Sequence, residues 1–254
     1  MFRIRSVLME NLSWSEIEKA IRHGYKTALV GFGAMEQHGP HLPISTDTIT
    51  ARELTVRAAL KANNTLVAPA IPFGSSVIHR FFPGTINIDT SLLEQYLINY
   101  LDCLLKCGFD RIVIAATHGG NFGTVDWVVE HYGRQGFPVF SAYTGDEFIE
   151  FMHTLSSDRG IPLSDAGTHA GEMETAIYIY LTGDVSVMKT APLGFTGDYS
   201  AVREEGLKKG MAYISANGVI GDARRATYEN GRYYTEKLVD FIASKCIGNP
   251  QAEP

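Results

Sequence analysis

The sequence predicts an α/β fold, with one domain over residues 1–254 and a mostly parallel central sheet flanked by helices. Short apolar runs rich in β-branched residues alternate with longer helical patterns, as is typical of βαβ units. The 254 residues, 45% apolar and 20% charged, suffice for one substantial core. No repeat, low-complexity tract or Pro/Ser-rich linker divides the chain, so we expect a single domain.

Four apolar runs are predicted to be strands, at residues 26–33, 65–70, 111–117 and 138–143. The third is apolar throughout, as expected for a parallel strand buried on both faces. Helices are predicted at 48–62, 90–107, 122–134, 171–181 and 227–246. Asp47 or Thr48 caps the first helix, and Asp89 or Thr90 the second. Residues 182–200 are rich in Gly and Pro and receive no assignment.

Composition excludes several classes of partner. The formal net charge of −6 argues against a nucleic-acid backbone, and no apolar run approaches the roughly 20 residues of a membrane span. The first residues lack the sustained apolar region of a signal peptide, so a cytoplasmic location is expected. Three cysteines in no framework spacing fit a reducing compartment. Cys103 and Cys107, four residues apart, are predicted to be core thiols on one helix face.

The segment at residues 36–47 is the richest in chemistry. It holds two carboxylates and two imidazoles, on Glu36, His38, His41 and Asp47. Two prolines and nearby glycines exclude a regular helix or an interior strand. Because the preceding residues form a predicted strand, this segment leaves the carboxyl end of the sheet, where open α/β sheets bind ligands.

Two further clusters follow likely element ends: His118 with Asn121, and His169 with Glu172 and Glu174. Mixed nitrogen and oxygen donors suit Zn, Mn or Fe, whereas calcium prefers oxygen alone. Taken singly, His118 fits a hydrogen-bonded loop residue, and the two glutamates fit a solvated helix face. The three clusters together favour a metal site. Asp47, with two carboxylate oxygens, could bridge a pair of ions about 3.5–4 Å apart.

These motifs resemble the creatininase (creatinine amidohydrolase) family. The resemblance begins with Glu-Gln-His-Gly-Pro-His-Leu-Pro at residues 36–43 and Thr-Asp at 46–47. It continues with Phe-Gly-Ser-Ser at 73–76, His79, and Phe-Pro-Gly-Thr-Ile at 82–86. Thr-His-Gly-Gly-Asn at 117–121, His-Ala-Gly-Glu-Met-Glu-Thr at 169–175 and Gly-Val-Ile-Gly-Asp at 218–222 complete it. The resemblance therefore spans nearly the whole chain in the expected order.

The resemblance implies a divalent-metal hydrolase with an α/β fold, assembled as a homohexamer. By the family pattern Glu36, Asp47 and His118 hold one metal ion. His38 and Asp47 hold the second, so that Asp47 bridges, and His169 lies in the substrate pocket. Two ions, Zn and/or Mn with Fe possible, are the implied cofactors.

One position departs from the family pattern. Creatininases proper carry a metal-binding Glu two residues after the equivalent of His118, and here that residue is Gly120. Glu174 is the first candidate to supply the missing carboxylate, and Glu172 is the second. The aromatic residue that packs on creatinine is also missing near residues 165–169, so a different substrate is expected.

The resulting hypothesis is that water activated by metal attacks a carbonyl carbon of a small polar molecule such as a cyclic amide or a formamide. His169 or Glu172 would transfer the proton, and His79, Asn121 and Thr168 would bind substrate. Three alternatives stay open: hydrolysis of a cyclic ketone such as an oxidised inositol, a non-catalytic metal-binding or small-molecule-binding protein, and a metal-independent isomerase or lyase.

Overall fold

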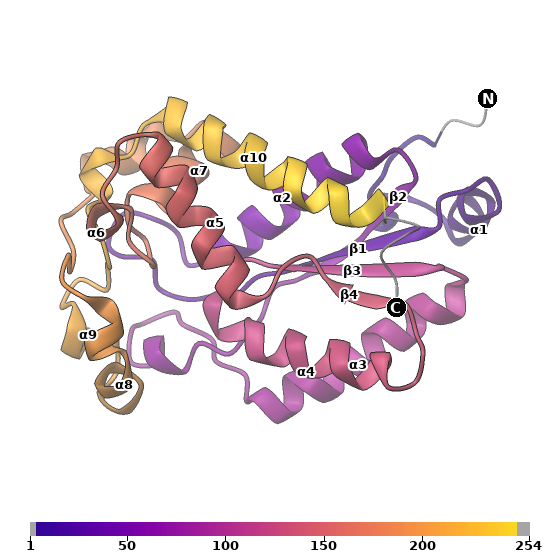
Figure 1. Ribbon diagram of the computed structural model, residues 1–254, viewed down its shortest axis with the longest axis horizontal. Coiled ribbons are helices and arrows are strands. Elements are labelled where there is room, and N and C mark those ends of the chain that lie inside the picture. Colours follow the sequence, from indigo (N-terminus) through magenta and orange to yellow (C-terminus); the bar gives the residue numbers. More distant parts are fainter. Residues whose placement is uncertain (1–3, 248–254) are drawn as a thin grey trace.

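A four-stranded parallel sheet forms the centre of residues 4–247, the part of the chain that this computed structural model describes (Figure 1). The strand order is β2-β1-β3-β4. The strands are β1 Thr27–Phe32, β2 Thr65–Ile71, β3 Arg111–Ala116 and β4 Val139–Ser141. All four predicted strands are present, and the predicted fold class is confirmed.

Alternation of side chains along β1 divides the core into two layers. Leu29 packs with residues of α2, α5, α7 and α10 on one face of the sheet. Ala28, Val30 and Phe32 pack with residues of α1, α3 and α4 on the other. Figure 1 shows α2, α7 and α10 above the sheet and α3 and α4 below it. These helices are α1 Trp14–Arg22, α2 Thr46–Ala62, α3 Thr90–Cys107, α4 Phe122–Gly133, α5 Gly145–Asp158, α7 Glu172–Thr182 and α10 Tyr228–Ile247.

Several elements differ from the sequence predictions. Helix α2 begins at Thr46, so Asp47 lies in its first turn and does not cap it. The sequence prediction left out α1, α5, α8 Tyr199–Lys209 and the one-turn helices α6 Leu163–Ala166 and α9 Met211–Ile214. The prediction that Cys103 and Cys107 are core thiols was wrong: both are exposed, because α3 buries its leucine stripe instead. Among the described residues, no helix combines the length and apolar composition that a membrane span requires.

The strand order creates a switch point. From β1 the chain proceeds outward to β2, then crosses back to place β3 on the opposite side of β1. The segments that follow β1, β2 and β3 therefore leave the same edge of the sheet, where crevices for ligands form in such folds. An isolated bridge from Met35 to Ile86 joins the segments after β1 and β2, and another from Gly74 to Asn87 closes the segment after β2 on itself. The short 3-10 helices η2 Val77–His79 and η3 Gly119–Asn121 lie in the segments after β2 and β3.

Candidate metal centre

The segment after β1 delivers two of the predicted ligand residues to the interior. Gly33 passes so close to α2 that a Cβ there would lie 2.6 Å from the backbone nitrogen of Thr48. This close approach demands glycine and directs the following loop over the start of α2. Glu36 and His38 are buried in that loop, and Asp47 enters from the first turn of α2. The loop and the helix together therefore bring three of the predicted ligands to one place.

Asp47 lies between His118 and His38 and faces each with one carboxylate oxygen. His118 Nδ1 lies 3.2 Å from Glu36 Oε1 and 3.4 Å from Asp47 Oδ2. His38 Nε2 lies 3.4 Å from Asp47 Oδ1 and 3.7 Å from Glu174 Oε2. In the group of Glu36, Asp47 and His118, the donor atoms all lie within 4.8 Å of one another, which is the spacing that a metal ion could draw together.

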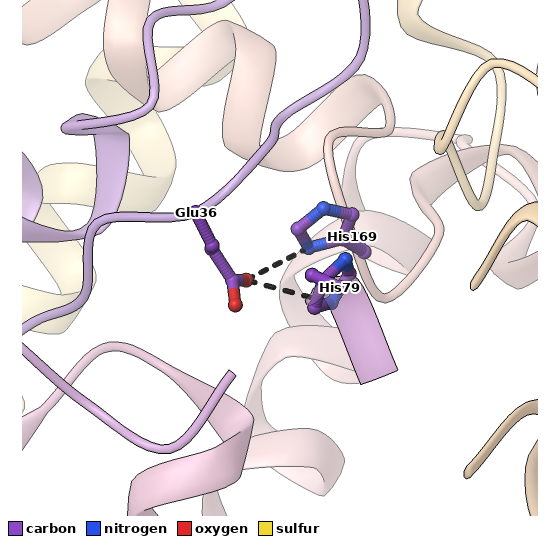
Figure 2. A group of neighbouring side chains, drawn as sticks. All are labelled: Glu36, His79 and His169. Atoms are coloured by element: carbon purple, nitrogen blue, oxygen red, sulfur yellow. Dashed lines mark ion pairs between the residues drawn. The ribbon is translucent and has the colours of Figure 1, made fainter. Parts of the chain in front are cut away.

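Two more histidines face the same carboxylate (Figure 2). His169 Nδ1 lies 3.5 Å from Glu36 Oε1, and His79 Nε2 lies 3.6 Å from the same oxygen. The His79 and His169 rings are stacked in a tilted arrangement with centroids 4.2 Å apart. His169 also falls within one donor group with His38 and Glu174. Two roles for His169, metal ligand and proton carrier, are thus compatible with its position.

Hydrogen bonds define which ring nitrogens face the cluster with a lone pair. The Nδ1–H of His38 donates to the Glu36 carbonyl at 3.1 Å, and the Nε2–H of His118 donates to the Ser75 carbonyl at 2.9 Å. The opposite nitrogens therefore point bare lone pairs at carboxylate oxygens. His38 Nε2, Asp47 Oδ2 and both carboxylate oxygens of Glu36 are buried without a hydrogen-bond partner. Such an arrangement is repulsive unless a cation or extra protons lie between the groups, so the residues fit a divalent metal.

Without a cation, protons take over part of this role. Burial alone lowers the pKa of His38, but the carboxylates of Asp47 and Glu174 outweigh it and raise the pKa from 6.5 to about 10. Burial likewise lowers the pKa of His118, and the charge of Glu36 together with Asp47 raises it well above its usual value. Burial raises the pKa of Glu174 to about 7, although His38 opposes this. A metal ion must displace these protons to bind.

The metal-free protein is therefore expected to lose stability as the pH rises from 6.5 to about 10. Protons on His38 and His118 are bound more tightly in the folded than in the unfolded state. Their stabilisation is complete below the unfolded pKa and is lost as the pH passes the folded pKa. Thermal melts across this pH range, with and without chelator, measure it. The Tm of a metal-loaded sample should not fall in this way. A constant Tm of the chelated protein across this pH range would contradict the role assigned to His38 and His118.

The space next to His118 explains how the second carboxylate can come from elsewhere. A Cβ at Gly120 would lie 1.9 Å from the Ser75 carbonyl oxygen and 2.5 Å from His118 Nε2. A glutamate, which the family pattern noted in the sequence places at this position, cannot fit beside this hydrogen bond. Glu174, on the first turn of α7, places its carboxylate near His38 instead. The Glu174 side chain is 30% exposed, against 5% for Asp47, so the cluster opens to solvent on this side.

Glu172, the other candidate carboxylate, lies apart from these groups. It is fully buried and accepts hydrogen bonds from Asn230 Nδ2 at 2.8 Å and from the Tyr234 hydroxyl at 3.2 Å. Both partners belong to α10, so this carboxylate joins α7 to α10. The structure does not bring Glu172 together with the predicted ligands.

Substitution of Glu172 should therefore reduce stability, whereas substitution of Glu174 should reduce metal content and activity. Glu172→Gln is expected to lower the free energy of unfolding by about 1–3 kcal/mol, because a buried charge-assisted hydrogen-bond network is weakened. Its metal content and kcat per folded molecule should stay near normal. Glu174→Gln should instead lose metal and activity with little change in the chelated protein's Tm. Metal analysis, activity and melts of both variants distinguish the two, and loss of metal in Glu172→Gln alone would reverse the assignment.

The remaining predicted residues have different surroundings. Asn121 is buried, accepts a hydrogen bond from the Ser75 amide and donates one to the Gly33 carbonyl. Its position favours a structural role, tying together the segments after β1 and β2. Thr168 is exposed and lies next to His169 in the chain. His41 accepts or donates one hydrogen bond with Thr175 at 2.9 Å and lies outside the donor groups found among the described residues.

Gln37 is a site residue that sequence reasoning missed. An extended segment would turn Gln37 away from Glu36 and His38, but the loop is irregular and Gln37 contacts both His79 and His169. The one feature of the sequence that could have indicated this role is the position of Gln37 between Glu36 and His38. The Ser75 carbonyl, which orients His118, had no sequence signal because it is a backbone group.

Comparison with known proteins identifies related sequences and structures. A family model described as creatinine amidohydrolase (Creatininase) matches residues 10–246. The mycofactocin precursor peptide peptidase of Mycolicibacterium smegmatis is 31% identical over 225 residues, covering 85% of this chain and 83% of that protein. The creatinine amidohydrolase of Pseudomonas putida is 27% identical over 94% of this chain and 95% of its own. A solved structure titled "Creatininase Mn" superimposes with a TM-score of 0.75 at 22% identity, covering 95% and 97%. The chain therefore belongs to the creatininase family and is an enzyme of the hydrolase type found in that family.

Proposed function

We propose that the protein hydrolyses an amide-type C–N bond with the help of two divalent ions, zinc or manganese, with iron as an alternative. The observation that carries this proposal is the position of Asp47, which faces His118 with one oxygen and His38 with the other, beside two donor groups, Glu36/Asp47/His118 and His38/His169/Glu174, that contain buried atoms without hydrogen-bond partners. In the proposal Glu36, Asp47 and His118 hold one ion, and His38, Asp47 and Glu174 hold the other. Gly120 supports the choice of Glu174, because no carboxylate fits beside the Ser75 carbonyl.

When bound, divalent ions lower the pKa of water toward neutrality and polarise a carbonyl group. The protein's own residues supply orientation and proton transfer. Substrate approaches from the side of Glu174, where the cluster is open to solvent. His169 accepts at Nδ1, the nitrogen that faces Glu36, the proton that the attacking water loses as it forms the new C–O bond, and returns it to the leaving nitrogen as the C–N bond breaks. Burial, together with the neighbouring imidazoles of His79 and His38, lowers the pKa of His169 well below its usual value, which keeps this nitrogen free.

The role of His169 is tested by the variant His169→Ala. Loss of a proton carrier is expected to lower kcat by about 100-fold or more while metal content stays near that of the unmodified protein. Equal loss of metal and activity would make His169 a ligand instead. His153→Ala, at a half-buried histidine of α5 outside the donor groups found among the described residues, is the matched control and should change neither quantity.

The substrate class is tested by a screen of the zinc- or manganese-loaded protein. Cyclic amides, formamides and short peptides all contain a C–N bond of the proposed kind. Short peptides are included because the similar protein of Mycolicibacterium smegmatis is a precursor peptide peptidase. Cyclic ketones test the alternative of C–C cleavage. Turnover that is abolished by chelation and restored by metal is expected with one of the amide classes. Turnover of cyclic ketones alone would replace the proposal by the C–C alternative. A cytoplasmic homohexamer remains the expected assembly and location.

A further inference from the structure

The carboxamide of Gln37 has an orientation that its backbone neighbours fix. Its Oε1 accepts a hydrogen bond from the Gly39 amide at 2.9 Å, and its Nε2 donates to the Gly218 carbonyl at 3.0 Å. Because one partner can only donate and the other can only accept, the oxygen and nitrogen cannot be exchanged. Gly218 has φ +78°, and a Cβ there would lie 2.1 Å from Gln37 Oε1, so glycine is required to make room for this side chain. Gln37 is only 5% exposed.

Counting protons then determines the tautomers of two histidines. One N–H of the Gln37 amide is used on Gly218, which leaves one. His79 Nδ1 lies 2.8 Å from the amide nitrogen, and since that nitrogen only donates, His79 Nδ1 must accept. His169 Nε2 lies 2.9 Å from the same amide nitrogen, but it lies nearer, at 2.7 Å, to the backbone carbonyl of Gln37, which can only accept. With the second amide proton on His79, the His169 Nε2 atom therefore carries the proton and donates it to this carbonyl. His79 therefore presents Nε2–H toward Glu36, while His169 presents a bare Nδ1.

We infer that Gln37 is the positioning residue that makes His79 the hydrogen-bond donor and His169 the proton acceptor of the site. This inference rests on the proposed hydrolytic function. The two nitrogens in question lie 3.6 Å and 3.5 Å from the same Glu36 oxygen, on adjacent rings (Figure 2). Without an external constraint two equivalent imidazoles at one carboxylate could exchange roles. The Gln37 side chain fixes the tautomer of His79, and the Gln37 backbone carbonyl fixes that of His169. His79 can therefore donate a hydrogen bond to developing negative charge, while His169 takes up the proton.

Gln37→Glu is the most direct test, because it keeps the size of the side chain and removes its N–H donors. A carboxylate beside His79 Nδ1 draws the proton to that nitrogen, so His79 should change to the Nδ1–H tautomer. Magic-angle-spinning NMR of the zinc-loaded protein labelled with ¹⁵N-histidine reports the tautomer, and His79→Asn assigns the signal. With the tautomer changed, kcat should fall about 100-fold, while KM and zinc content change less than threefold.

Gln135→Glu is the matched control, since the Gln135 amide nitrogen lies 2.9 Å from His131 Nε2 at an exposed position just after α4. It should leave kcat and zinc content unchanged. If Gln37→Glu does not fold, Gln37→Met removes the same bonds without adding charge and should give a mixture of His79 tautomers. A single Nε2–H tautomer of His79 in either folded variant would overturn the inference. Absence of hydrolysis by the unmodified protein would overturn the proposed function only, because the NMR result does not depend on turnover.

Discussion

Replacing Asp47 with asparagine is expected to abolish metal-dependent turnover, with at least about a 1,000-fold loss of kcat/KM. The carboxylate faces His38 with one oxygen and His118 with the other, each at 3.4 Å. Asparagine keeps the shape but offers one weaker oxygen ligand and no charge, so both proposed ions lose a donor at once. A loss of several kcal/mol of transition-state stabilisation corresponds to a rate effect of about this size.

Metal content and activity are measured together for this variant. Asp89→Asn is the matched control, because Asp89 likewise lies at the start of a helix, immediately before α3, but is exposed and makes no side-chain capping bond. It should behave like the unmodified protein. If Asp47→Asn retains both ions and normal turnover, the assignment of the whole centre is wrong.

Restoring the creatininase-type carboxylate by Gly120→Glu is expected to damage the site. Any Cβ at this position would lie 1.9 Å from the Ser75 carbonyl oxygen, a distance that forces the backbone to move. If the backbone moves, the hydrogen bond between His118 Nε2 and the Ser75 carbonyl, which fixes the His118 ring, is lost. Even Gly120→Ala should lower the free energy of unfolding by more than about 2 kcal/mol and weaken metal binding by about 10- to 100-fold.

The neighbouring glycine provides a close control for this prediction. A Cβ at Gly119 meets no atom within 4 Å, and its φ is not in the left-handed region. Gly119→Ala should therefore change stability by less than about 0.5 kcal/mol and leave metal binding intact. Melting curves and metal titrations of both alanine variants measure the contrast. If Gly120→Ala binds metal as tightly as Gly119→Ala, the Ser75 contact does not decide which carboxylate the site uses.

Much of the fold followed from local patterns. The four strands are short apolar runs, and their parallel arrangement placed the polar segments at one edge of the sheet. Helix α5 was missed although its capping box, Thr144 with Glu147, can be recognised in the sequence. The exposure of Cys103 and Cys107 could not be read from spacing, because the leucines of α3 define a competing and wider apolar stripe.

The sequence predicted which residue types form the site, but it did not predict which way some of their side chains point. Glu172 and Glu174 lie two positions apart on α7 and so point to nearly opposite sides of the helix. Which side faces the sheet edge depends on how the chain enters α7, through Ala170 in a left-handed conformation with φ 51°. Gln37 was missed for a related reason, since its loop does not follow the alternation of a strand. Tertiary packing decides both, and no local pattern encodes it.

In the proposed centre, two ions share Asp47 between the His118 and His38 sides of the cluster. Anomalous diffraction from crystals of the zinc-loaded protein tests it most directly. We predict two peaks about 3.5–4 Å apart, one beside Glu36 and His118 and the other beside His38 and Glu174, with Asp47 contacting both. A single peak, or peaks away from Asp47, would contradict the proposed two-metal centre.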